Sequence, residues 1–90
     1  MALGVLAGCA VAAPVQEMSN ARQAVQAARE AKAEQYAPQD LGKAERLLKQ
    51  ATTELQLGKY NEARSHALAA RQAAVVARNI ALTSSGRSNE

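Results

Sequence analysis

The chain has 90 residues, which limits it to one domain with a small hydrophobic core. Apolar residues make up 48% of it, but many are alanine, Phe and Trp are absent, and Tyr36 and Tyr60 are the only aromatic residues. Because burial stabilises in proportion to the apolar atoms removed from water, an alanine core contributes less than a leucine core of equal residue number. We therefore expect marginal stability, and with it self-association or a protein partner.

The charge and the cysteine count exclude further classes of protein. The net charge of +3 comes from 11 Lys and Arg residues against 8 Asp and Glu residues, and no aromatic residues alternate with the basic ones. Such a chain offers little to a nucleic acid, which binds through dense positive charge and base stacking. Cys9 is the only cysteine, so no disulfide can form within the chain. We expect no nucleic-acid partner.

Residues 1–13 form a short apolar leader without a charged residue. The leader is shorter than the roughly 20 residues that a helix needs to span a bilayer. It fits instead the end of the apolar region of a signal peptide, followed by its small-residue cleavage site. A signal peptide begins with basic residues, but the leader contains no Lys or Arg. We therefore expect the true start of the protein to lie upstream. The alternative is an apolar tail, disordered or packed on a helix, with a free thiol at Cys9.

The four residues Leu6-Ala7-Gly8-Cys9 resemble the lipobox of bacterial lipoprotein precursors. The resemblance implies that residues 1–8 are the remnant of a signal peptide, that Cys9 carries lipid such as palmitate, and that residues 9–18 form a lipidated tether. Two or more acyl chains hold a protein stably at a membrane. Ala10 replaces the aspartate that this pattern associates with inner-membrane retention, which implies the outer membrane, with the chain facing the periplasm.

The spacing of apolar residues predicts a first helix over residues 19–36. Ser19 or Asn20 can cap its start by accepting a backbone hydrogen bond. Apolar residues then recur at spacings of four and three from Ala21 to Ala28, as on one face of a helix.

A second helix is predicted over residues 38–57, because Pro38 suits a first helical position and Asp40 suits the positive end of the helix dipole. Its stripe is Leu41, Ala44, Leu48, Ala51 and Leu55. Gly58 ends it, since glycine adopts the left-handed cap at little cost. A single long helix bent at Pro38 is the competing geometry.

A third helix is predicted over residues 60–82, where alanines repeat at spacings of three and four. The polar residues 84–90 are expected to form a disordered tail, which leaves a helical domain over residues 19–83. Short links favour antiparallel neighbours, so the expected fold is all-α, a small antiparallel three-helix bundle.

Two resemblances cover this helical part. The segment from Ala44 to Ala51, followed by Gly58-Lys59-Tyr60-Asn61-Glu62-Ala63, is similar to a tetratricopeptide helical hairpin in the second and third helices, a repeat that needs about three copies to form a groove. Nearly the whole chain also resembles an uncharacterised bacterial envelope lipoprotein family, a domain of unknown function. The residues that carry this second resemblance are Cys9, Tyr36-Ala37-Pro38, Ala44, Leu48, Ala51, Gly58, Tyr60 and Ala63. It implies an envelope location and no known activity.

The sequence gives no sign of an enzyme, a metal site or a cofactor. His66 is the only histidine and has no second ligand at a metal-binding spacing, so we expect it to face solvent on a helix. Ser65 adjoins it, but neighbouring residues on a helix point about 100 degrees apart and do not meet.

Arg64, Arg71 and Arg78 are spaced by seven, so they lie along one side of the third helix. This ridge could contact lipid phosphates, lipopolysaccharide or an acidic protein face. A solvated ridge, or one that pairs with glutamates on neighbouring helices, is the competing interpretation; the candidate glutamates are Glu30, Glu34, Glu45 and Glu54.

Three functional hypotheses follow. The first is a non-catalytic structural or protein-interaction module of the bacterial envelope, anchored to the membrane by lipid on Cys9, with an unidentified envelope protein or a second copy as its partner. The second is a soluble cytoplasmic helical oligomer or adaptor with a free thiol. The third is binding of an anionic lipid or polysaccharide through the arginine ridge.

Overall fold

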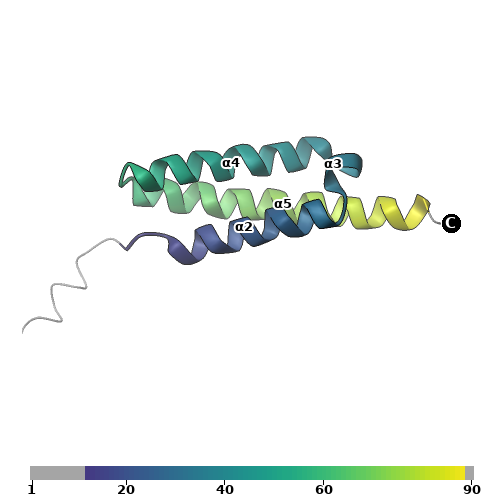
Figure 1. The fold of residues 1–90 in the computed structure, drawn as a ribbon, viewed down its shortest axis with the longest axis horizontal. Helices are drawn as coiled ribbons and strands as arrows, with labels where there is room; N and C mark the ends of the chain where they lie inside the picture. Colours follow the sequence, from purple (N-terminus) through teal and green to yellow (C-terminus); the bar gives the residue numbers. More distant parts are fainter. Residues whose placement is uncertain (1–11, 89–90) are drawn as a thin grey trace, which may run out of the picture.

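The computed structural model describes residues 12–88, and these residues are helical almost throughout (Figure 1). The helices are α2 (Val15–Glu30), α3 (Ala33–Tyr36), α4 (Pro38–Gln56) and α5 (Tyr60–Ser88). Within the described range there is no β-strand. The all-α prediction is therefore confirmed.

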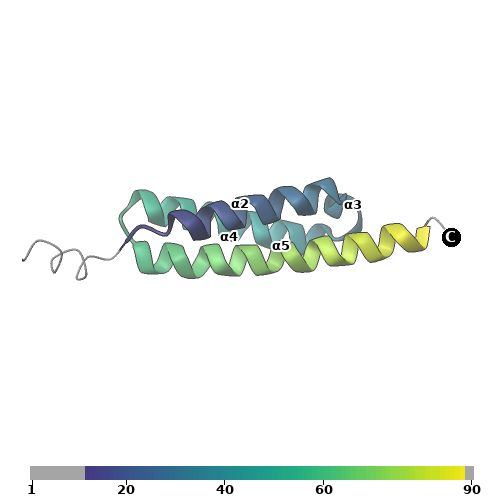
Figure 2. The same cartoon turned by 90° about the horizontal axis from the view of Figure 1, so that it is seen from below.

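Three long helices lie lengthwise beside one another, and the single turn α3 occupies the corner between α2 and α4 (Figures 1 and 2). Met18, early in α2, shares a buried cluster with Ala67, and Ala28, late in α2, shares another with Ala77. Helices α2 and α5 therefore run in the same direction, and α4 runs against both. At about 1.5 Å per residue, the 29-residue α5 is the longest, and its C-terminal end extends past the other helices.

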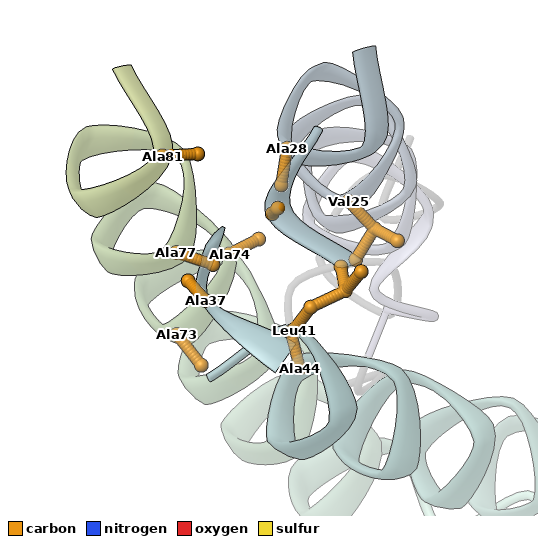
Figure 3. Packing of buried hydrophobic residues seen from close by; sticks show 10 residues of the cluster. Val25, Ala28, Ala37, Leu41, Ala44, Ala73, Ala74, Ala77 and Ala81 are labelled. Atoms are coloured by element: carbon orange, nitrogen blue, oxygen red, sulfur yellow. The ribbon is translucent and has the colours of Figure 1, made fainter. Parts of the chain in front are cut away.

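The inner face of α5 consists of alanine. Its buried residues are Ala63, Ala67, Ala70, Ala73, Ala74, Ala77 and Ala81. Larger buried side chains come from the other helices, namely Met18 and Val25 of α2 and Leu41 of α4. Figure 3 shows Val25 and Leu41 in one of the two buried clusters. Because the distance between packed helices depends on the side chains at their contact, this methyl surface lets α5 lie close to both neighbours.

The link between α4 and α5 follows the sequence prediction. Gly58 has φ 77, the left-handed conformation that glycine tolerates best. Its N–H donates to the Leu55 carbonyl oxygen at 3.1 Å, and the N–H of Lys59 donates to that of Glu54 at 2.8 Å. These two bonds form a Schellman motif, which satisfies the last carbonyls of α4.

The link between α2 and α4 differs from the sequence prediction, in which the first helix continued to residue 36. Helix α2 ends at Glu30, Lys32 has φ 67, and α3 follows as a separate turn, so residues 19–36 are not one helix. Ala37 then has φ −144, which separates α3 from α4, and Pro38 is the first residue of α4 as predicted. The single helix bent at Pro38 is therefore not formed.

Both ends of the helical part also differ from prediction. Helix α2 begins at Val15, so Ser19 and Asn20 lie inside it and do not cap it. They accept i,i+4 hydrogen bonds from Gln23 at 3.2 Å and Gln16 at 2.9 Å instead.

The buried Met18 likewise places the end of the predicted 9–18 tether inside the core. At the other end, α5 continues to Ser88, so residues 84–88 of the predicted disordered tail are helical. None of the described helices is both long enough and apolar enough to cross a bilayer.

Candidate functional site

The large aliphatic side chains of α5 lie outside the core. Leu68 is 51% exposed, Val75 41% and Leu82 47%, whereas the inward-facing alanines of the same helix are almost completely buried. Val76 and Ile80 are exposed as well. The helix thus buries its smallest apolar residues and exposes its largest ones, the reverse of an ordinary core helix.

Five residues of α5 form one strip along the helix, and all of them except Leu68 line the hollows between α5 and α2. Leu68, Val75 and Leu82 are spaced by seven, and Arg71 and Arg78, also spaced by seven, lie between them at alternating steps of three and four. A repeat of this spacing keeps its members on one side of a helix. We call these five residues the α5 flank.

A groove between α2 and α5 runs beside the flank. Its volume is about 430 Å³, and its walls are Arg71, Val75 and Arg78 of α5 together with Asn20, Gln23, Ala24 and Ala27 of α2. A second hollow of about 220 Å³ extends it toward α3, where Arg78 and Leu82 face Glu30 and Ala31. The α2 wall is thus made of small or uncharged side chains, apart from Glu30 at one end.

The predicted arginine ridge divides into two parts. Arg64 makes contacts within the fold: its Nε lies 3.3 Å from Glu17 Oε2, and its terminal nitrogen donates to the Ala12 carbonyl oxygen at 2.9 Å. Arg71 and Arg78 make no ion pair with any residue of the described range. Of the three predicted arginines, Arg64 is therefore engaged within the fold, and Arg71 and Arg78 remain available at the groove.

Of the glutamates proposed as partners of that ridge, Glu45 and Glu54 contact other side chains, and Glu30 lines the second hollow with Arg78 without forming an ion pair with it. Glu45 Oε2 accepts a hydrogen bond from Arg29 Nε at 3.0 Å, which joins α2 to α4. Glu54 contacts His66, and Glu17, which the sequence analysis did not consider, is the acid that meets Arg64. Pairing of the α5 arginines with Glu45 or Glu54 is therefore excluded.

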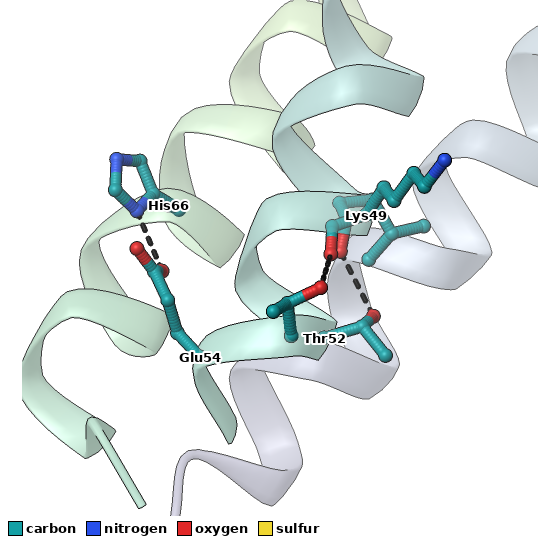
Figure 4. Close-up of polar contacts among 6 residues, drawn as sticks. Lys49, Thr52, Glu54 and His66 are labelled. Atoms are coloured by element: carbon teal, nitrogen blue, oxygen red, sulfur yellow. Dashed lines mark hydrogen bonds and ion pairs between the residues drawn. The ribbon is translucent and has the colours of Figure 1, made fainter. Parts of the chain in front are cut away.

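His66 is half-buried rather than free in solvent. Its Nδ1 lies 2.7 Å from Glu54 Oε1 across the α4–α5 interface (Figure 4). Elsewhere on α4, the Thr52 hydroxyl donates to the Leu48 carbonyl oxygen at 2.8 Å. Among the described residues, no three His, Cys, Asp or Glu side chains are grouped so that they could hold a metal ion.

Sequence reasoning found the arginines of the site but missed its other wall. Asn20 and Gln23 line the groove only because α2 runs parallel to α5, and no sequence spacing relates these two helices. The spacing of Leu68, Val75 and Leu82 by seven was a signal that could have identified the flank. Cys9, the predicted lipidation site, lies outside the described residues.

Comparison with known proteins adds a family but no activity. A family model described as a domain of unknown function, DUF4398, matches residues 16–88. Neither the curated proteins nor the solved structures gave a match.

Proposed function

The chain belongs to the DUF4398 family, and we propose that it is a non-catalytic interaction module that binds another protein of the bacterial envelope through the α5 flank. In this proposal, α2, α4 and α5 act as a three-helix bundle in which α4 and α5 form a hairpin similar to a tetratricopeptide repeat. Lipid on Cys9 holds the module at the membrane, with the outer membrane as its destination.

One observation carries the binding role: the aliphatic side chains of the flank are exposed although the core of the molecule is poor in large residues. Full burial of a Leu or Val side chain is worth about 1.5–3 kcal/mol, and a large part of this gain is not used within the chain because these side chains are 41–51% exposed. A contiguous apolar strip bordered by polar groups is typical of a protein-binding surface. The flank combines three such side chains with two arginines, a residue type enriched at interfaces.

The lipid anchor is supported by the lipobox resemblance of Leu6-Ala7-Gly8-Cys9. Only five residues separate Cys9 from the start of α2 at Val15. A chain of that length spans on the order of 20 Å when fully extended. Lipidation would therefore hold the helices close to the membrane surface and present the flank to proteins located there.

Metabolic labelling with a fatty acid tests the anchor. We expect label on the native protein and none on Cys9→Ser, since the thiol is the attachment point. Ala13→Ser serves as the matched control, because it changes another small residue of the leader and leaves the thiol in place. Absence of label from the native protein would reject the anchor and leave the binding role untouched.

Site-specific photocrosslinking in intact cells tests the binding role. A photoreactive residue at Gln72, which is exposed beside the flank, is compared with one at Gln50, which is exposed on α4. We expect a discrete covalent adduct from position 72 and none from position 50. The same adducts from both positions, or none from either, would contradict the proposal.

A further inference from the structure

We infer that the groove between α2 and α5 receives an acidic amphipathic helix of a different protein, which lies along the α5 flank. This inference rests on the proposed function and names the chemistry of the partner. It follows from the shape of the groove, from its charge, and from the positions of the acidic residues of this chain.

The shape of the groove suits a helix. It lies between two helices that run side by side in the same direction, and Ala24 and Ala27 on the α2 wall allow a close approach. From Leu68 to Leu82 the flank spans 14 residues, which is about 21 Å of helix. A partner helix of two heptads matches this length, and its apolar residues would pack against Leu68, Val75 and Leu82.

The charge of the groove selects acidic residues on that helix. Arg71 and Arg78 have no ion-pair partner in the described part of the chain, and α5 carries no acid after Glu62 as far as Ser88. A guanidinium at such a groove is best satisfied by a carboxylate, which can accept two parallel hydrogen bonds. The two arginines are seven residues apart, or about 10.5 Å along the helix, so the partner needs carboxylates at the same interval.

A second copy of this chain does not supply that pattern. Three described acids, Glu17, Glu45 and Glu54, already contact a basic side chain. The other four lie on four different helices; they are Glu30, Glu34, Asp40 and Glu62. No described helix therefore presents two available carboxylates seven residues apart, and the partner is a different protein.

An anionic bilayer fits the groove less well than a helix does. Basic segments that bind lipid surfaces carry about four to eight Lys or Arg residues, whereas this groove has two arginines and one glutamate. The groove is also concave between two helices, while the lipid surface is flat. An acidic helix therefore uses both the charge and the shape of the site.

A pair of synthetic helical peptides tests the inference with the full chain. Both are monomeric and carry leucines along one face; one has glutamates spaced by seven beside the leucines, and the other has lysines there. Fluorescence anisotropy measures their affinity for the native chain, for Arg71→Glu with Arg78→Glu, and for Arg22→Glu with Arg46→Glu. The last pair makes the same charge change at exposed positions outside the groove.

We expect the native chain to bind the acidic peptide at least about tenfold more tightly than the basic one, an effect that added salt weakens. The Arg71→Glu, Arg78→Glu variant should reverse this preference, and the Arg22→Glu, Arg46→Glu control should keep it. Equal affinity for the two peptides, or no binding of the acidic one, overturns the inference. So does a native chain that binds phosphatidylglycerol vesicles through Arg71 and Arg78 but does not bind the acidic peptide.

The photocrosslinking experiment separates this inference from the proposed function on which it rests. If the adduct at Gln72 persists in the Arg71→Glu, Arg78→Glu variant, the flank binds a protein but the partner is not acidic. If no adduct forms even in the native chain, the proposed binding role itself is rejected.

Discussion

The two sides of α5 carry opposite kinds of apolar side chain. In the core between α2 and α4, every buried side chain of this helix is an alanine. Along the α5 flank it presents Leu68, Val75 and Leu82 to solvent, with Arg71 and Arg78 between them. An ordinary amphipathic helix has the opposite distribution, with its largest apolar residues facing inward.

This difference shows how one helix can serve both the fold and a partner. The alanine side brings three helices close together, but it gains little from burial of each residue. The largest buried apolar side chains are supplied by α2 and α4; they are Met18, Val25 and Leu41. The large side chains of α5 add little to the fold and are left for contacts outside it.

The variant with the largest expected loss of stability tests whether the core depends on the few large side chains of α2 and α4. Leu41 is 4% exposed, so Leu41→Ala removes packed atoms and leaves a cavity. We expect the free energy of unfolding to fall by about 2–5 kcal/mol, measured by urea denaturation. Leu57→Ala is the control, because Leu57 is 65% exposed and should lose less than about 0.5 kcal/mol. Similar losses in both variants would contradict the division between core and surface.

A variant with a smaller expected loss of stability tests whether alanine is required on the inner side of α5. Ala74 is completely buried between helices, so Ala74→Leu should force α5 away from its neighbours. We expect a loss of about 1–3 kcal/mol in the free energy of unfolding. The control Ala69→Leu adds the same atoms to the same helix at an exposed position, and its midpoint should stay near that of the native chain. A stable Ala74→Leu variant would show that the close approach is not needed.

The smallest effect concerns the turn that aligns α2 with the inner side of α5. Lys32 adopts φ 67, which is unfavourable for a residue with a Cβ atom, while Ala33 and Ala37 beside it are buried. Lys32→Gly should raise the free energy of unfolding by up to about 1 kcal/mol, since relief of strain exceeds the entropy added to the unfolded chain. Thermal unfolding measures it, with Lys59→Gly as the control outside that conformation. A destabilised Lys32→Gly variant would mean that this turn is not strained.

The two turns also show how far the sequence determines the fold. Gly58 carries its own signal, because glycine adopts a left-handed conformation easily, and the end of α4 was predicted within one residue. The break at Lys32 has no such signal, since alanines flank it and neither glycine nor proline is present. Ala33 and Ala37 are buried in one cluster with alanines of α5 that are distant in sequence, and a local pattern contains no information about such packing.

The candidate site also has one part that the sequence predicts and one part that it does not. The spacing by seven placed Arg64, Arg71 and Arg78 on one side of their helix, which depends only on helical geometry. Arg64 differs from the other two because it contacts Glu17 and the Ala12 carbonyl oxygen, which lie 47 and 52 residues before it in sequence. Only the packing of α2 beside α5 brings these groups together.

The central claim is that the α5 flank binds another protein, and photocrosslinking of a flank variant tests it most directly. Leu68→Gln with Val75→Gln removes two exposed aliphatic side chains, so the unfolding midpoint should match that of the native chain. With the photoreactive residue at position 72, we predict that the native chain gives a discrete adduct in cells and that this variant gives none. An adduct of equal yield from the equally stable variant would contradict the account.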